Sequence, residues 1–228
     1  MVMSDPLNFS GRAFLSYLTE LKTLVGEQSV KMILRKSGWL DQVRIIVSTK
    51  HDKKAPYQAI LDINREIEEI FGQNAQKTVV FASARKSFVY SYANFVEIQE
   101  TKAWIAKHPE STLRLRTALQ VIIYVLEQTT MQKIQLQESS SHYHLTFDHS
   151  MVASDQKEHK QPHCFFLVGM IRGGLNYLFD ADLYPVQELS CVSAGDHQCE
   201  FTVRKFQFSD YEKGTGKTGF LTLPTHLR

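Results

Sequence analysis

The sequence predicts an α+β fold in which helices pack on an antiparallel sheet. Apolar residues recur at helical spacing through most of the first 128 residues. The repeat then shortens from about 3.6 to about 2 residues, the period of a strand. One apolar helix and two further strands follow that change. Because helices come first and hairpins come later, this order is typical of an α+β domain.

The N-terminal part of the chain predicts two helices and a short strand. The first helix covers 10–25, where Ser10 can cap the start and Gly26 can end it. A second helix follows at 27–37. Residues 43–49 are rich in β-branched side chains, which favour a strand.

Four more helices are expected before the first hairpin. Pro56 precedes the first of them and Gly72 follows it, as is usual for the two ends of a helix. Their predicted ranges are 57–71, 75–93, 97–107 and 111–128. The last of these has the widest apolar stripe and should therefore be well buried.

An antiparallel hairpin with one buried face is predicted next. Apolar residues alternate with polar ones at Ile134 and Leu136, and again at Tyr143, Leu145 and Phe147. A Glu-Ser-Ser-Ser turn at 138–141 joins the two arms. This alternation is typical of a sheet with one solvated face, so His142 and His144 are expected to point to solvent.

The C-terminal part predicts a buried helix and two more strands. Pro162 opens an apolar helix that reaches about Leu178. Its glycines at 169, 173 and 174 are expected to let the sheet approach its backbone. The strands are expected at 183–190 and 198–206, and 152–162 should be a loop.

Length and charge limit the possible functions. The 228 residues fit a single domain at 1–206, with a motif core at 111–206 and a flexible tail at 207–228. The net charge of +2 gives no electrostatic footprint for nucleic acid. The N-terminus lacks the pattern of a signal peptide, and no apolar run reaches the roughly 18 to 20 residues that span a bilayer. We therefore expect a cytoplasmic protein, with a membrane-protein partner left open.

The three cysteines of the chain predict a metal site. Cys164, Cys191 and Cys199 fall within 36 residues, and Glu188 lies three residues before Cys191. An Ala-Gly-Asp turn between the last two cysteines can bring these residues to one end of a hairpin. Cys164 would reach them from the electropositive N-terminus of the buried helix, which favours a thiolate. Three thiolates and one carboxylate suit a closed, structural zinc site.

A simpler interpretation is that the cysteines are small buried apolar residues. Clustering alone favours neither interpretation. A disulfide is less favoured, because three cysteines always leave one over and a cytosolic chain stays reduced.

The stretch from 164 to 203, CFFLVGMIRGG…PVQELSCVSAGDHQCEFTV, resembles the C-terminal signature of the 4-vinyl-reductase domain family. That family includes the bacteriochlorophyll-synthesis 4-vinyl reductase protein and the sensory domains of aromatic-responsive activators. The matching positions are Glu188, Cys191, Gly195, Asp196, Cys199 and Phe201. The resemblance implies a zinc site at Cys164, Glu188, Cys191 and Cys199, and a fold like that of nitric-oxide-binding domains. The segment between Gly174 and Glu188 is about one residue longer here than in the family.

The resemblance also implies a ligand-binding function. We expect a non-catalytic protein that binds a hydrophobic or aromatic small molecule, with a tetrapyrrole as one candidate. It would act as a carrier or assembly factor in pigment or photosystem biogenesis, that is, in photosynthesis. The alternatives are a tetrapyrrole vinyl reductase and a dimeric protein-interaction module. The residues lean against an enzyme without settling the question, because they show no nucleophile–base set and no redox CxxC.

The ligand pocket is expected between the helix at 111–128, the hairpin and the buried helix. Its candidate lining residues are Tyr124, Tyr143, Leu145, Phe147, Phe166 and Tyr177. Arg116 and Arg172 are candidates to pair a ligand carboxylate. The alternative is that the apolar candidates simply fill the core.

Two further expectations concern oligomers and nucleotides. Family relatives pair through their helical parts, so a homodimer is expected through the N-terminal helices, where Phe9 and Trp39 suggest exposed aromatics. The segment from Gly214 to Gly219 matches GxGxxG, but it lacks the strand and helix that a dinucleotide site needs.

Overall fold

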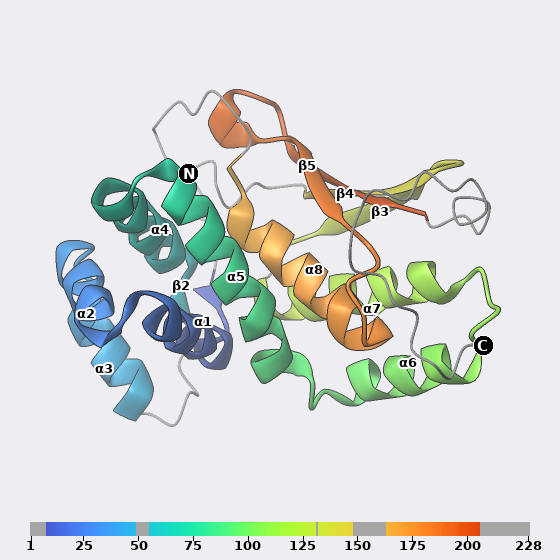
Figure 1. Cartoon of the computed structure of the whole chain (residues 1–228), viewed down its shortest axis with the longest axis horizontal. Coiled ribbons are helices and arrows are strands. Elements are labelled where there is room, and N and C mark those ends of the chain that lie inside the picture. The colour runs from blue at the N-terminus through green and yellow to red at the C-terminus, as the bar shows by residue number, and fades with distance from the viewer. Residues whose placement is uncertain (1–7, 49–54, 131, 148–162, 206–228) are drawn as a thin grey trace, which may run out of the picture.

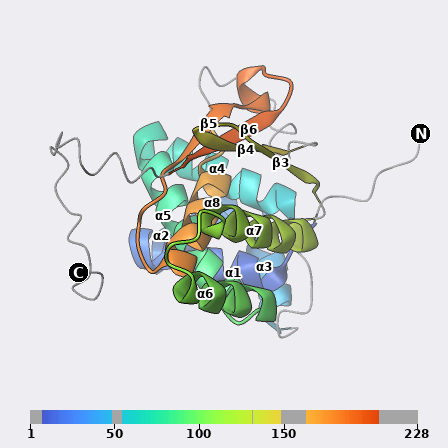
Figure 2. The ribbon, with the colours of Figure 1, turned by 90° about the vertical axis from the view of Figure 1, so that its right-hand side faces the viewer.

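The computed structural model describes residues 8–48, 55–130, 132–147 and 163–205. Within them, helices pack against a four-stranded antiparallel sheet, which confirms the predicted α+β class. Figure 1 and Figure 2 show the sheet on one side of the molecule, lying across α7 and α8. The predicted loop at 152–162 and the tail at 207–228 lie outside the described residues.

Eight α-helices occur in the described part of the chain, and seven of them match the predicted ranges. Their bounds are α1 Gly11–Val25, α2 Glu27–Lys36, α3 Leu40–Ser48, α4 Tyr57–Phe71, α5 Gln73–Tyr92, α6 Val96–Lys107, α7 Arg114–Thr130 and α8 Phe165–Phe179. Gly26 and Gly72 each end one helix and begin the next, with φ angles of 85° and 83°. Positive φ is costly for other residues, which explains glycine at both breaks. None of the described helices is long and apolar enough to cross a membrane.

The prediction of a strand at 43–49 is wrong, because this segment lies in α3. Val43 and Ile46 are three residues apart and both pack into the core, and Ile46 is fully buried. Asp41 in the first turn accepts a hydrogen bond from Arg44 at 3.1 Å. Packing of one helical face against α1 and α2 thus outweighs the β propensity of the run.

The sheet has the strand order β3-β4-β6-β5. Its strands are β3 Ile134–Glu138, β4 His142–Phe147, β5 Val186–Ser190 and β6 Cys199–Arg204, and two-residue strands β1 Asn8–Phe9 and β2 Ala55–Pro56 pair elsewhere. In the β4–β6 pair, Tyr143 lies opposite Val203 and Phe147 lies opposite Cys199. The predicted alternation of β4 is confirmed, since Tyr143, Leu145 and Phe147 are all buried. This register brings the start of β6 to the end of the sheet where Phe147 lies.

Helix α8 packs most closely on α5, and its glycines make that contact possible. A Cβ atom at Gly169 would lie 2.6 Å from the carbonyl oxygen of Phe81, and one at Gly173 would lie 2.2 Å from that of Arg85. A Cβ at Gly174 would meet the side chains of Ile122 and Phe88 instead. The prediction that these glycines admit the sheet is therefore wrong, because they admit other helices.

Candidate metal centre and ligand cavity

The four predicted metal ligands meet at one end of the sheet. Cys164 is the N-cap of α8, Glu188 lies on β5, and Cys199 begins β6. Cys191 is the N-cap of a short 3₁₀-helix, η2 Val192–Ala194. One sulfur or carboxylate oxygen from each residue lies within 4.8 Å of all the others. The local structure thus brings together residues from four separate elements.

The sulfur–sulfur distances lie close to those of a tetrahedral zinc site. The Sγ atom of Cys164 lies 3.5 Å from that of Cys191 and 3.5 Å from that of Cys199, and the remaining pair is 3.9 Å apart. A zinc ion with Zn–S bonds of about 2.3 Å has tetrahedral edges of about 3.8 Å between its sulfur ligands. A disulfide would need about 2.05 Å, and all three cysteines are free.

The cluster brings four groups that can carry a negative charge close together in a largely buried place. Desolvation raises the pKa of the Cys164 thiol well above its usual range, and burial raises the pKa of Glu188 to about 8. Hydrogen bonds from the other two thiols hold the pKa of Cys191 far below its usual value. Oxygen Oε1 of Glu188 is buried and has no hydrogen-bond partner among the described residues. A divalent cation would compensate all four groups at once.

Backbone and hydroxyl groups support the cysteines from behind. The N–H of Val192 donates to the Sγ of Cys199 at 3.4 Å, and the hydroxyl of Ser193 lies 3.0 Å from the Sγ of Cys191. The carboxylate of Asp196 accepts the N–H of Cys191 at 2.8 Å. Sequence reasoning assigned the Gly-Asp pair to a turn and missed these supporting groups. A donor set with such partners suits a structural metal, because they orient the ligands before the metal binds.

A cavity of about 180 Å³ lies between α7 and the β3–β4 hairpin. It is lined by Arg116, Gln120 and Ile123 from α7, by Ile134, Leu136 and Glu138 from β3, and by Tyr143 from β4. Its place matches two of the three elements that the sequence assigned to a pocket. Sequence reasoning missed most of these residues, although their spacing of four and three on the helix and of two on the strand is the signal that could have found them.

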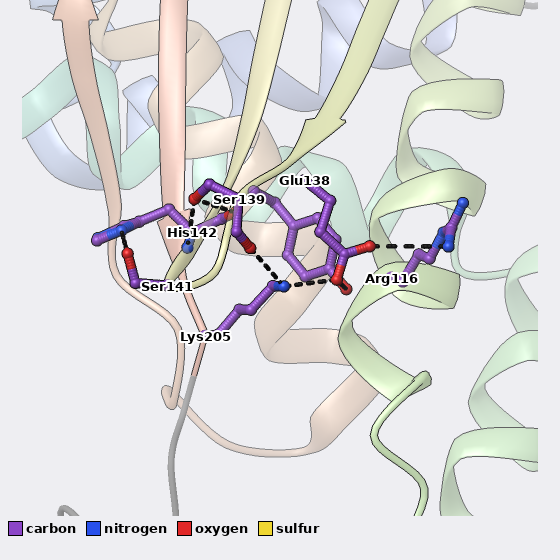
Figure 3. Close-up of polar contacts among 7 residues, drawn as sticks. Arg116, Glu138, Ser139, Ser141, His142 and Lys205 are labelled. Carbon is purple, nitrogen blue, oxygen red and sulfur yellow. Dashed lines mark hydrogen bonds and ion pairs between the residues drawn. The ribbon is translucent and has the colours of Figure 1, made fainter.

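One end of this cavity is polar. Figure 3 shows Glu138 between Arg116 and Lys205. The Nζ atom of Lys205 donates to Glu138 at 2.5 Å, and the hydroxyl of Tyr143 donates to the same carboxylate at 3.2 Å. The hydrogen bond from Lys205 holds the pKa of Glu138 below its usual value. Burial and the charge of Glu138 raise the pKa of Tyr143 to about 12.

Only Tyr143 of the six predicted pocket residues lines this cavity. Leu145 and Phe147 lie in the core behind it, where Phe147 contacts Phe201 edge to face. Tyr124 is 44% exposed, and its hydroxyl lies 3.5 Å from Glu97. These residues are therefore not gathered around one space.

Phe166, Tyr177 and Arg172 lie elsewhere. Phe166 borders a second cavity of about 30 Å³ that touches Cys164 and has room for little more than water. The ring of Tyr177 lies 4.1 Å from the Nζ atom of Lys102. Arg172 makes two hydrogen bonds to Asp182, at 2.8 and 2.7 Å, so it already has a carboxylate partner within the chain.

No family model matches the chain, and no curated protein matches its sequence. Among solved structures, the chain is similar to an H-NOX protein from S. oneidensis in the Fe(II) ligation state, with a TM-score of 0.57 and 13% identity over 87% of this chain and 96% of that one. The same protein in the Fe(II)NO state gives 0.54 and 13% over 85% and 97%. The phenol-responsive sensory domain of the transcription activator PoxR gives 0.48 and 13% over 72% and 84%. At this identity the likeness to the H-NOX structures shows the fold alone.

An iron porphyrin, which a nitric-oxide-binding-like fold implies, does not fit either of these cavities, since the one that His163 and Cys164 border has a volume of only about 30 Å³. No histidine or cysteine lines the 180 Å³ cavity, and the volume is far below what a macrocycle needs. His144 lies on the polar side of β4 and contacts Glu200 at 2.7 Å.

Proposed function

We propose that this chain is a non-catalytic binding domain for a small, largely apolar molecule, which occupies the cavity between α7 and β3–β4. The observation that carries the proposal is the composition of the cavity wall. Ile123, Ile134 and Leu136 provide an apolar floor, while Arg116 and Glu138 stand at one end. An apolar cavity with a few convergent polar groups is the usual form of a small-molecule site.

The size of the cavity favours a ligand with one ring or a short branched chain. Its volume of about 180 Å³ is below the roughly 300–1,000 Å³ of sites that enclose drug-sized molecules. A tetrapyrrole would require α7 and the sheet to part. We therefore propose the smaller ligand, and a role in pigment or photosystem biogenesis stays a prediction.

The titratable groups of the cavity favour binding over acid–base catalysis. Lys205 holds Glu138 in its ionised form, so this carboxylate is a weak base and a poor proton donor near neutral pH. The raised pKa of Tyr143 keeps its phenol protonated. A general acid or base works best when its pKa lies near the working pH, and neither group is tuned in that direction.

We also propose zinc as the metal of the Cys164, Glu188, Cys191 and Cys199 centre. Four protein donors leave no position open for a substrate, which is typical of a structural site. Bound zinc would fix the start of α8 to β5 and β6. The metal would thereby hold the sheet in the position that forms the cavity.

Titration with single-ring compounds tests the binding proposal. Neutral, anionic and cationic compounds are titrated in turn and followed by protein-observed NMR. At least one of them should shift the resonances of residues around the cavity in a saturable way. Ile123→Trp should abolish that binding by filling the cavity, whereas Leu113→Trp, an exposed position outside it, should not. Saturable binding that Ile123→Trp leaves intact, or no binding by any compound, would overturn the proposal.

A homodimer through the N-terminal helices remains part of the proposal. Met32 on α2 and Val47 on α3 are large apolar residues exposed to solvent, and Val47 is 55% exposed. Trp39 is less available for such an interface than the sequence suggested, because its Nε1 donates to Asp62 at 3.0 Å within the fold. Light scattering should give twice the chain mass, and Val47→Lys should shift it toward the monomer. A monomer for the unmodified protein at micromolar concentration would contradict this expectation.

A further inference from the structure

The polar end of the cavity has one more positive charge than negative charge. Arg116 and Lys205 lie on either side of the single carboxylate of Glu138 (Figure 3). Oxygen Oε1 of Glu138 accepts hydrogen bonds from both Lys205 and Tyr143. Lys205 also donates to the carbonyl oxygen of Ser139 at 2.7 Å. Glu138 and Lys205 therefore pair with each other, and Tyr143 and the carbonyl oxygen of Ser139 provide further hydrogen bonds to them.

Arg116 is the cation that makes no hydrogen bond to Glu138. Its Nη1 atom lies 3.7 Å from Oε2 of Glu138, which is an ion pair but too long for a hydrogen bond. Its side chain is 51% exposed. A guanidinium has five N–H donors in a planar fork that matches a carboxylate. Arg116 thus keeps donors available at the mouth of the cavity.

The two walls of the cavity change from polar to apolar in the same direction. On α7, Arg116, Gln120 and Ile123 follow one another along one helical face, over about 10 Å of helix axis. On the inward face of β3, the order is the same: charged Glu138 is followed by the aliphatic Leu136 and Ile134. A molecule that fills this space is therefore expected to have a polar head and an apolar body.

We infer that the ligand is a small monocarboxylate with an aromatic or branched aliphatic body. This inference rests on the proposed function of the cavity. The ligand carboxylate pairs with Arg116, and its body lies on Ile123 and Ile134. A ligand ammonium group would meet Arg116 and Lys205 and is disfavoured. A dianion is disfavoured as well, because Glu138 stays ionised beside Arg116.

Binding of three compounds with one ring and different heads tests the inference. Benzoate, benzyl alcohol and benzylamine are titrated into the full chain at low ionic strength and followed by calorimetry and NMR. A charge-assisted pair, discounted for the exposure of Arg116, gives benzoate about a tenfold tighter Kd than benzyl alcohol. Benzylamine should bind most weakly. Added salt should reduce the preference for benzoate, because the pair is open to solvent.

Substitution of Arg116 separates this inference from the proposed function. Arg116→Gln should remove the tenfold advantage of benzoate, so that benzoate and benzyl alcohol bind with similar Kd values. Arg35→Gln, which removes the same charge from the exposed side of α2, should change neither. The inference fails, and the proposed function stands, if benzyl alcohol binds as tightly as benzoate or if Arg116→Gln keeps the preference. Absence of binding by all three compounds contradicts both.

Discussion

The carboxylate of Asp196 accepts the backbone N–H of Cys191 at 2.8 Å, and the N–H of Asp196 donates back to the carbonyl oxygen of Cys191 at 3.2 Å. These two bonds close the turn that carries Cys191 toward Cys199. Gly195 lies within this turn, directly before Asp196, and its φ of 96° suits glycine. The turn thus positions Cys191 and Cys199, two of the candidate metal ligands.

The first prediction is that Asp196 controls metal affinity and not metal stoichiometry. Asp196→Ala removes the acceptor for the Cys191 N–H, which should weaken metal binding by about 10- to 100-fold, the usual cost of losing a group that orients a ligand. Asp196→Asn keeps an acceptor oxygen and should lose much less. Competition with a chromophoric chelator measures both variants. Unchanged affinity in Asp196→Ala would show that the turn holds without this bond.

The second prediction concerns the sulfur ligands themselves. Purified protein should contain one zinc per chain, and Cys191→Ser or Cys199→Ser should lose most of it. Either change should also lower the unfolding temperature sharply, because metal binding energy adds directly to folding. Elemental analysis and thermal unfolding measure the two effects.

A neighbouring serine provides the control for the cysteine variants. Ser190 is half-buried, and its hydroxyl bonds to the carbonyl oxygen of Gln198 outside the sulfur cluster. Ser190→Ala should therefore keep the full metal content. Less than about a tenth of an equivalent of zinc in unstripped protein would rule out the centre as a zinc site.

Local signals in the sequence were sufficient for most of the fold. Gly26 and Gly72 separate helices at the expected places, because glycine most readily adopts the positive φ that ends a helix. The alternation at Tyr143, Leu145 and Phe147 predicted the buried face of β4, because successive side chains of a strand point to opposite faces. The strand predicted at 43–49 failed because packing against α1 and α2 decides its structure, and those contacts are not local.

The two parts of the candidate site differed in how far they could be predicted. The four candidate metal ligands lie within one stretch of 36 residues, and their spacing together with the family resemblance was enough to predict that they meet. The charged end of the cavity joins Arg116, Glu138 and Lys205, and Lys205 is far from Arg116 in the sequence. Its position depends on the pairing of β4 with β6, which no local pattern contains.

The third prediction is a pH dependence that originates at Asp182. Hydrogen bonds from Arg172 hold the pKa of Asp182 below its usual value, and Arg85 adds a weaker attraction. Since the folded pKa is depressed, this pair stabilises the fold above the unfolded pKa of about 3.9 and loses its effect as the pH falls through the folded value.

Thermal unfolding against pH measures this effect. Asp182→Asn should lower the unfolding temperature slightly at neutral pH, by a small amount because the Asp182 side chain is 41% exposed. The difference from the unmodified protein should shrink as the pH falls below about 4, and it should be smallest below the depressed folded pKa, where Asp182 is protonated in both states. A difference that stays constant down to low pH would mean that charge is not its origin.

The fourth prediction tests the contact between α5 and α8. Alanine normally stabilises a helix by about 1 kcal/mol relative to glycine. At Gly173, however, the new Cβ would lie 2.2 Å from the carbonyl oxygen of Arg85, so the backbone of α5 or α8 must move. Overpacking of this kind costs typically 1–3 kcal/mol, which should outweigh the gain in propensity. Gly173→Ala should therefore lower the free energy of unfolding.

The adjacent glycine is the matched control. A Cβ at Gly174 would meet Cδ1 and Cγ1 of Ile122 at 2.8 Å and the ring edge of Phe88 at 2.9 Å. These are side-chain atoms, which can adjust at lower cost than a carbonyl group. Chemical denaturation should therefore rank Gly173→Ala as more destabilising than Gly174→Ala. The reverse order would mean that α8 does not approach the backbone of α5 as closely as described, and that Gly173 is needed for another reason.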